Sequence, residues 1–149
     1  MTESRQRILI ADDNQANREL LEAHLLDLDC ELDFAEDGQQ TLDKVTEFQP
    51  DLILLDVMMP RLSGFEVCKK IKSDPETRRI MILMVTALNE LGDIERAVDA
   101  GTNDFLSKPV SRVALLKRVE NMLKIKDVTD ENERLRRYIY EMEEETQKK

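Results

Sequence analysis

The sequence predicts an α/β fold in which helices cover both faces of a parallel β-sheet. Five short apolar runs alternate with segments whose apolar residues recur at three- and four-residue spacing, which is typical of strands and amphipathic helices. Strands that alternate with helices along a chain form a parallel sheet. The length of 149 residues suits one domain with an appendage, and 41% hydrophobic with 36% charged residues is the composition of a folded chain.

The N-terminal part of the chain contains two strand–helix units. The run "RILIA" at 7–11 predicts the first strand, and "ELDFA" at 31–35 predicts the second. The second run alternates polar and apolar residues, which favours an edge position in the sheet. The helix after each strand is marked by apolar residues at helical spacing: Leu20, Leu21, Leu25 and Leu28 in the first helix, and Leu42, Val45 and Phe48 in the second.

The next two strands are apolar throughout, as expected for strands that helices cover on both faces. They are "LILL" at 52–55 and "IMILMV" at 80–85, and the turn sequence "DPETR" at 74–78 precedes the second of them. A fifth strand, "DFL" at 104–106, follows a helix that ends near Gly101, a residue type common just after helices. Apolar residues mark the last three helices: Phe65, Cys68 and Ile71; Leu91, Ile94, Ala97 and Val98; and, after Pro109, Val113, Leu116, Val119 and Leu123.

Composition and charge argue against several classes of function. A formal charge of −10 argues against a nucleic-acid surface, since phosphate contacts need clustered Lys and Arg, and the absence of Trp argues against a base-stacking platform. No apolar run approaches the roughly 18 residues that a membrane helix needs. The start, "MTESRQRILI", lacks the apolar core of a signal peptide. We therefore expect a cytoplasmic protein that binds neither nucleic acid nor membrane.

Thiol and imidazole groups offer no site of their own. Cys30 and Cys68 are too few for a disulfide framework and lack metal-ligand spacing, so we expect reduced, half-buried thiols. His24 is the only histidine and lies in a predicted helix, where we expect neither a catalytic role nor a metal.

Candidate site residues follow four of the five predicted strands, at the edge where such sheets bind ligands, whereas Glu36 and Asp37 after the second strand are unremarkable. The candidate site residues are Asp12 and Asp13 after the first strand, Asp56 after the third, Thr86 and Ala87 after the fourth, and Lys108 after the fifth. If the strand order is 2-1-3-4-5, the first and third strands are neighbours. Asp12, Asp13 and Asp56 then share one crevice.

Three carboxylates in one crevice repel each other, so one of them keeps a proton or a cation enters. Hard oxygen ligands suit magnesium, which binds one or two carboxylates together with phosphate oxygens and water. Lys108 as a point charge and Thr86 as a hydroxyl donor complete an anion site. This combination indicates phosphoryl transfer, with Asp56 as a nucleophile that forms an aspartyl phosphate. Taken singly, each acidic residue also has a structural explanation, such as Asp13 or Asn14 capping the helix that follows.

Four segments resemble the receiver domain of bacterial two-component response regulators. They are "ILIADDNQANRELLEAHL", "DLILLDVMMPRLSGFEVCKKIK", "VTA" and "GTNDFLSKP", and the resemblance covers about residues 6–125. It implies a flavodoxin-like (βα)5 fold, a doubly wound parallel sheet of order 2-1-3-4-5, over a receiver domain at 1–125. Asp56 would be the phosphoacceptor in a two-component phosphorelay. Such a domain is a signalling module and catalyses only its own phosphorylation and dephosphorylation.

The resemblance also implies roles for the neighbours of Asp56. Mg²⁺ (or Mn²⁺) would be held by the side chains of Asp13 and Asp56 and by the backbone carbonyl of Met58, with Asp12 supporting it through water. Thr86, the backbone of Ala87, and Lys108 would hold phosphoryl oxygens. On phosphorylation Thr86 would move toward the phosphoryl group and Phe105 would occupy the vacated space. The Lys108–Pro109 peptide bond would be cis. The donor would be a sensor histidine kinase or a phosphotransfer protein.

The C-terminal 126–149 segment predicts a helical extension that forms a coiled coil. No Pro or Gly follows Pro109, so the fifth helix can run on. Six residues, five of them apolar, fall at heptad a and d positions: Ile125, Val128, Asn132, Leu135, Ile139 and Met142. Asn132 at an a position favours a parallel homodimer. A solvated single helix, or a break at "DVTDEN", is the alternative. We expect the extension to carry the signal to an output domain or partner that the sequence does not identify.

Other functions fit the residues less well. A haloacid-dehalogenase-like phosphatase would also use an aspartyl-phosphate nucleophile, but it needs a second Asp where Met58 stands. A dinucleotide-binding enzyme needs a Gly-rich turn after the first strand, where this chain has "DDNQAN". A scaffold whose phosphorylation is irrelevant would not need the intact acidic set.

Overall fold

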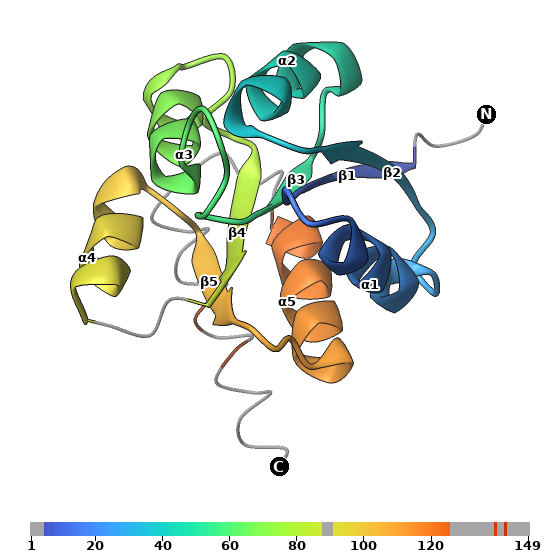
Figure 1. Cartoon of the computed structure of the whole chain (residues 1–149). Coiled ribbons are helices and arrows are strands. Elements are labelled where there is room, and N and C mark those ends of the chain that lie inside the picture. Colours follow the sequence, from blue (N-terminus) through green and yellow to red (C-terminus); the bar gives the residue numbers. More distant parts are fainter. Residues whose placement is uncertain (1–4, 88–90, 126–138, 140–141, 143–149) are drawn as a thin grey trace.

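Within the described residues, a five-stranded parallel sheet is packed against five helices (Figure 1). The computed structural model describes residues 5–87, 91–125, 139 and 142. The strand order is β2-β1-β3-β4-β5, so the predicted flavodoxin-like architecture is confirmed. In chain order the elements are β1 (Gln6–Ala11), α1 (Gln15–Leu25), β2 (Cys30–Ala35), α2 (Gly38–Phe48), β3 (Leu52–Leu55), α3 (Gly64–Ser73), β4 (Met81–Thr86), α4 (Leu91–Ala100), β5 (Asp104–Ser107) and α5 (Arg112–Ile125).

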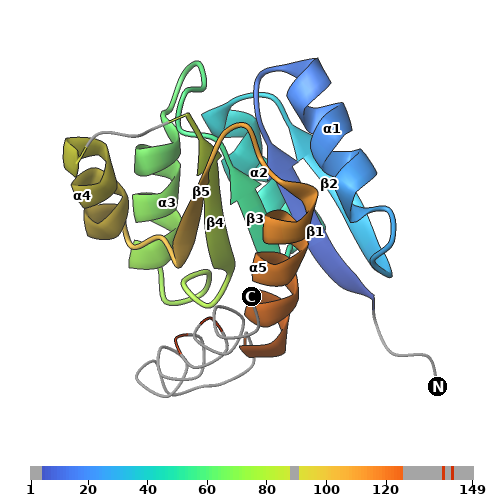
Figure 2. The same cartoon turned by 90° about the horizontal axis from the view of Figure 1, so that it is seen from below.

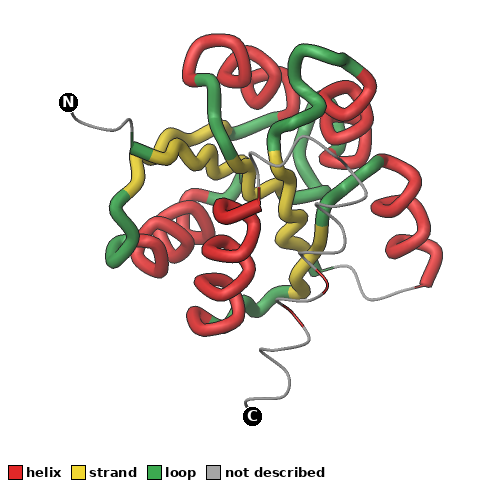
Figure 3. Tube along the Cα trace, turned by 180° about the vertical axis from the view of Figure 1, so that it is seen from behind, coloured by secondary structure: helices red, strands yellow, loops and turns green. Residues whose placement is uncertain are grey.

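Two helix layers sandwich the sheet (Figures 2 and 3). Helices α1 and α5 pack on one face, and α2, α3 and α4 pack on the other. Successive residues of a strand point to opposite faces, and both sides of the central strands are therefore apolar. In β1, Ile8 contributes to the core under α1 and α5, whereas Leu9 contributes to the core under α2, α3 and α4.

The register of the strands places their carboxyl ends at one level. Ala11 pairs with Leu55 across β1 and β3, and the next residues, Asp12 and Asp56, therefore leave the sheet side by side. The backbone N–H of Asp56 donates to the carbonyl of Ala11 at 2.9 Å, which extends the ladder by one bond. On the other side, Thr86 at the end of β4 pairs with Ser107 at the end of β5.

Side-chain caps begin the first three helices. Asn14 caps α1 by accepting from the N–H of Asn17, and Asp37 caps α2 by accepting from the N–H of Gln40. In α3, Ser63 forms a reciprocal capping box with Glu66. Of the two caps that the sequence allowed for α1, the structure uses Asn14. Asp13 does not cap α1, and its carboxylate belongs to the acidic cluster of the crevice.

The predicted helical extension at 126–149 lies outside the described residues, except for residues 139 and 142. Ile125 is 3% exposed and packs in the core under α1 and α5, so its side chain does not face a partner chain. The Nδ2 of Asn121 on α5 lies 3.6 Å from the Sδ of Met142. Met142 therefore lies against α5 of its own chain, where Nη1 of Arg118 is also within 3.4 Å of its Sδ. Val128, Asn132 and Leu135 lie outside the described residues, and Ile139 is partly exposed.

None of the helices within the described residues combines the length and the apolar character needed to cross a bilayer.

Candidate functional site

Three carboxylates converge at the carboxyl ends of β1 and β3. One oxygen each from Asp12, Asp13 and Asp56 lies within 4.8 Å of the other two. Asp12 and Asp56 are only 1% and 6% exposed, whereas Asp13 lies at the surface. The structure thus brings together the three acidic residues that the sequence places at neighbouring strand ends.

Backbone groups fix the two buried carboxylates. Oδ1 of Asp12 accepts from the N–H of Asn14 at 2.9 Å, and the N–H of Asp12 itself donates to the carbonyl of Ala35 at 3.1 Å. Oδ1 of Asp56 accepts from the N–H of Met58 at 3.3 Å. These bonds follow from the tight turns that leave the sheet after β1 and β3. They orient the carboxylates before any ligand arrives.

Lys108 supplies the positive charge of the crevice. Its Nζ lies 2.9 Å from Oδ2 of Asp12 and 3.4 Å from Oδ2 of Asp56. The backbone N–H of Lys108 donates to the carbonyl of Thr86 at 2.8 Å, which ties the loop after β5 to the end of β4. The Lys108–Pro109 bond is cis, as the resemblance implies. Lys108 therefore reaches both buried carboxylates from the opposite side of the crevice.

The crevice contains more negatively than positively charged groups. Burial raises the pKa of the Asp56 carboxyl above its usual value, the Lys108 ammonium lowers it and the Asp12 carboxylate raises it again, with a raised pKa as the outcome. Burial lowers the pKa of Lys108, but the hydrogen bond to Asp12 and the charges of Asp56 and Asp12 together raise it. With three carboxylates and one ammonium all ionised, the crevice carries a formal charge of −2.

The hydroxyl of Thr86 is available to a ligand. Thr86 ends β4 and is buried, yet its Oγ1 has no hydrogen-bond partner among the described residues. A buried polar group without a partner costs about 1–3 kcal/mol, so such groups are rare and call for an explanation. An acceptor that enters the crevice would satisfy this hydroxyl.

The remaining predicted residues lie around this centre. The side chain of Met58 is exposed beside the crevice, and Ala87 follows Thr86 at the surface. Phe105 on β5 pairs in register with Met84 on β4 and packs, partly buried, against the core under α2, α3 and α4. Its core packing alone is enough to explain an aromatic residue here, and a switch role is compatible with it.

The donor set fits a hard divalent cation. The cluster contains only carboxylate oxygens, without His or Cys, and Asp13 opens it to solvent. Magnesium prefers this combination of one or two carboxylates with several retained waters. Zinc sites, in contrast, are usually built from imidazole or thiolate ligands.

Sequence reasoning missed one residue of this region, Arg18. Its Nη1 donates to the backbone carbonyl of Asp12 at 2.7 Å. The available signal was a cation in the first turn of the helix that follows the acidic pair, where helices prefer acidic residues. The partner is a carbonyl group, and no pattern of side chains shows where a carbonyl points.

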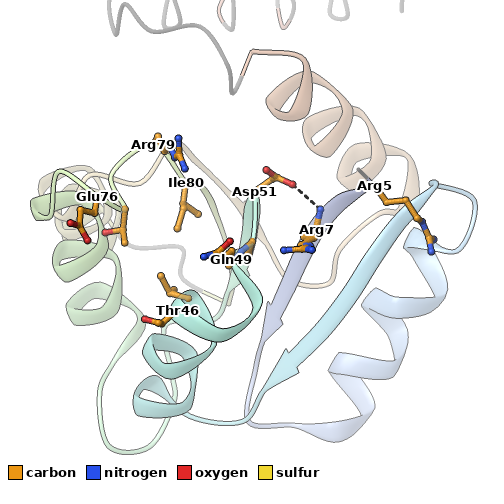
Figure 4. A pocket seen from close by; sticks show the side chains of 11 residues that line it. Arg5, Arg7, Thr46, Gln49, Asp51, Glu76, Arg79 and Ile80 are labelled. Atoms are coloured by element: carbon orange, nitrogen blue, oxygen red, sulfur yellow. Dashed lines mark hydrogen bonds between the residues drawn. The ribbon is translucent and has the colours of Figure 1, made fainter. Parts of the chain in front are cut away.

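A cavity of about 700 Å³ lies at the opposite edge of the sheet, near the amino ends of β1 and β3 (Figure 4). Polar and charged side chains line most of it, among them Arg5, Arg7, Asp51 and Arg79. Oδ2 of Asp51 accepts from the N–H of Arg7, while the guanidinium groups of Arg5 and Arg7 pair with Asp29 and Glu31. None of the predicted site residues lines this cavity, and the acidic crevice remains the candidate site.

Comparison with known proteins identifies what the fold and crevice resemble. The family model described as "Response regulator receiver domain" matches residues 8–120. The response regulator PleD of Caulobacter vibrioides is 46% identical over 125 residues, which cover 84% of this chain. The chain spans 28% of the length of PleD and about half of several other regulators that it matches.

Solved structures of a response regulator and of a receiver domain resemble this chain. A putative response regulator from Chloroflexus aurantiacus is 32% identical and superposes with a TM-score of 0.76, over 82% of this chain and 99% of its own. The receiver domain of the sensor histidine kinase PA1611 from Pseudomonas aeruginosa is 31% identical, with a TM-score of 0.74 over 81% of this chain and 99% of its own. In that receiver domain a magnesium ion is coordinated in the active-site cleft.

Proposed function

The chain belongs to the response regulator receiver domain family, and from this premise we propose that it is a phosphorylation switch whose phosphoacceptor is Asp56. The donor would be the phosphohistidine of a sensor histidine kinase or of a phosphotransfer protein. The observation that carries the proposal is the convergence of Asp56 with Asp12, Asp13 and Lys108, since one oxygen of each carboxylate lies within 4.8 Å of the others.

In the proposed reaction an oxygen of Asp56 attacks phosphorus. The new bond joins that oxygen to phosphorus, and the phosphorus–nitrogen bond of the donor breaks, leaving its electron pair on the imidazole. Such a reaction is catalysed chiefly by positioning and by neutralising charge. Asp56 is held for it by the N–H of Met58 and by Lys108.

Mg²⁺ would be held by the side chains of Asp13 and Asp56 and the carbonyl of Met58, with Asp12 acting through water; Mn²⁺ would fit the same oxygens. When bound, the ion neutralises charge on the transferring phosphoryl oxygens. Lys108, which is shared between Asp12 and Asp56, can turn its ammonium to a phosphoryl oxygen. The unpartnered hydroxyl of Thr86 and the N–H of Ala87 would donate to other phosphoryl oxygens.

The proposed signal is a shift of Thr86 and Phe105. When Thr86 turns toward the phosphoryl group, it vacates space near the end of β4 that the ring of Phe105 can fill. Thr86 lies on β4 and Phe105 on the neighbouring strand β5, so a movement of one side chain can affect the other directly. The change would alter the surface formed by α4, β5 and α5.

The output of this switch is also a proposal. The heptad pattern of 126–149 supports a homodimer through the C-terminal extension, which would signal to an output domain or a downstream protein. Ile125 is excluded from that interface because it is buried in the core, and Met142 is left out of it because Met142 contacts Asn121 on α5 of the same chain. Cytoplasmic location remains a prediction from the sequence.

Phosphorylation with a small donor tests the proposal. The chain is incubated with acetyl phosphate and Mg²⁺, and its intact mass is measured beside Asp56→Asn and beside Asp43→Asn, a control at an exposed aspartate of α2. We expect the unmodified chain and Asp43→Asn to gain one phosphoryl group, and Asp56→Asn and a sample with EDTA to gain none. Equal labelling of Asp56→Asn would contradict the assignment, and turnover of general phosphomonoesters would indicate a phosphatase instead.

A further inference from the structure

Arg18 connects helix α1 to the acidic turn after β1. Its Nη1 lies 2.7 Å from the backbone oxygen of Asp12, and its Nη2 lies 3.6 Å from Oε1 of Glu36 after β2. The Arg18 side chain is 13% exposed, whereas that of Glu36 is 68% exposed. An ion pair at this distance with an exposed carboxylate contributes little. The carbonyl of Asp12 is therefore the main partner of Arg18.

A cation is unfavourable at this position for two reasons. Arg18 lies near the start of α1, where the helix dipole is positive and disfavours a guanidinium. Its side chain is also largely removed from water, which costs free energy unless hydrogen bonds compensate. Neither the helix dipole nor burial favours Arg18, and the hydrogen bond to the Asp12 carbonyl offsets both costs.

That contact completes the fixation of Asp12. Its N–H donates to Ala35, its Oδ1 accepts from Asn14 and its Oδ2 accepts from Lys108. The carbonyl is the remaining polar group, and Arg18 holds it. This carbonyl belongs to the peptide that joins Asp12 to Asp13, so its direction sets the direction in which Asp13 leaves the turn.

Asp13 depends on this peptide more than its neighbours do. None of the described residues donates a hydrogen bond to the Asp13 carboxylate, which is exposed, whereas Asp12 and Asp56 are both bonded to Lys108. Repulsion from those two carboxylates favours an Asp13 turned toward solvent. Among the described residues, only the backbone of the turn opposes a rotation of the Asp13 carboxylate toward solvent.

We propose that Arg18 is a positioning residue for the divalent metal: by holding the Asp12 carbonyl, it aims the Asp13 carboxylate at the ion. The inference rests on the proposed function, because the proposed function assigns Asp13 as a ligand of the metal. Partners that orient metal ligands in this way typically change metal affinity by 10–100-fold when they are removed.

Mg²⁺ affinity, measured by titration calorimetry, tests the inference on the full chain, Arg18→Ala, Arg18→Lys and Glu36→Gln. Thermal unfolding of each is followed in EDTA and in saturating Mg²⁺. We expect Arg18→Ala to weaken Mg²⁺ binding by about tenfold. Arg18→Lys, whose ammonium can also donate to a carbonyl, should recover most of the affinity. Glu36→Gln should bind Mg²⁺ as the unmodified chain does.

The two possible failures are distinguishable. If Arg18→Ala unfolds at a lower temperature in EDTA but binds Mg²⁺ as tightly as the unmodified chain, Arg18 is merely structural and the inference is wrong, while the proposed function stands. Equal weakening of Mg²⁺ binding by Glu36→Gln would also overturn the inference, because the Arg18–Glu36 ion pair would then be the cause. If the unmodified chain binds no Mg²⁺, the proposed metal site and this inference fall together.

Discussion

Asp56 illustrates at the scale of a single residue how a side chain of the candidate site opposes stability. Its carboxylate is buried, accepts from the N–H of Met58 and lies near a single ammonium that it shares with Asp12. Burial raises its pKa, which means that the folded state disfavours its charge. Proteins often carry such destabilised groups at sites where activity requires them.

Asp56→Asn should therefore stabilise the metal-free protein. The substitution removes a buried negative charge and leaves Lys108 paired with Asp12. At neutral pH in EDTA we expect an increase of about 1 kcal/mol in the free energy of unfolding, or ~4 °C in the unfolding temperature. Thermal unfolding measures the difference, with Asp43→Asn as the control. A less stable Asp56→Asn would show that its charge is favourable in the fold.

The same comparison depends on pH with a definite sign. The folded pKa of Asp56 is raised above the ordinary value of 3.8, so protonation of this group favours folding. That stabilisation is complete below the unfolded pKa and is lost as the pH rises through the folded pKa. The advantage of Asp56→Asn should thus be greatest near neutral pH and shrink toward pH 4. A difference that grows on acidification would contradict the raised pKa.

Single residues also show what the sequence could predict of the site and what it could not. Asp12, Asp13, Asp56, Thr86 and Lys108 were predictable because each follows an apolar run, and parallel strands end at one edge of a sheet. Arg18 was not, because its partner is a backbone oxygen. The choice of Asn14 over Asp13 as helix cap was not predictable either, since both side chains are good caps.

At the scale of the elements, the strands and helices were predictable where the apolar pattern has one interpretation. The run at 52–55 coincides with β3, and the alternating run at 31–35 lies within the edge strand β2. Ile125 was wrongly assigned because its pattern has two interpretations. The stripe that packs α5 on the sheet consists of Leu115, Val119, Met122 and Ile125. The same three- and four-residue spacing is that of coiled-coil a and d positions.

The start of α3 couples an element to the site. An added Cβ at Gly64 would lie 2.3 Å from the backbone oxygen of Asp56 and 2.7 Å from Cα of Val57. The N–H of Gly64 also donates to the carbonyl of Val57 at 2.9 Å. Only glycine allows the helix to approach the segment that carries Asp56, the proposed phosphoacceptor.

Gly64→Ala should therefore destabilise the fold. Overpacking of this kind costs roughly 1–3 kcal/mol, because the backbone on either side has to shift. Urea unfolding would measure the loss, with Lys69→Ala on the exposed side of α3 as the control, expected within about 0.5 kcal/mol of the unmodified chain. Unchanged unfolding of Gly64→Ala would mean that the close approach is not maintained in solution.

At the scale of the whole molecule, the strand order creates the site. The chain leaves β1 for the edge strand β2 and returns to β3 on the other side of β1 (Figure 1). The loops after β1 and β3 therefore diverge, and a crevice opens between them at the carboxyl edge of the sheet. The cavity at the amino edge of the sheet does not lie between these diverging loops (Figure 4).

The C-terminal extension carries the prediction about assembly. Sedimentation of the full chain is compared with that of a chain ending at Ile125, which keeps the buried Ile125 in the core. We expect the full chain to dimerise and the shortened chain to remain monomeric, because the heptad pattern lies in the removed segment. If both are monomers at high concentration, with and without a phosphate mimic, the extension does not dimerise the protein.

The most direct test of the proposed metal site is a crystal grown with Mn²⁺, in which anomalous scattering locates the ion. One ion should lie about 2 Å from oxygens of Asp13 and Asp56 and from the carbonyl of Met58. Asp12 should contact it only through water. An ion bound elsewhere, or carboxylates of Asp13 and Asp56 that point to separate places in the presence of Mn²⁺, would contradict the site and the phosphorylation built on it.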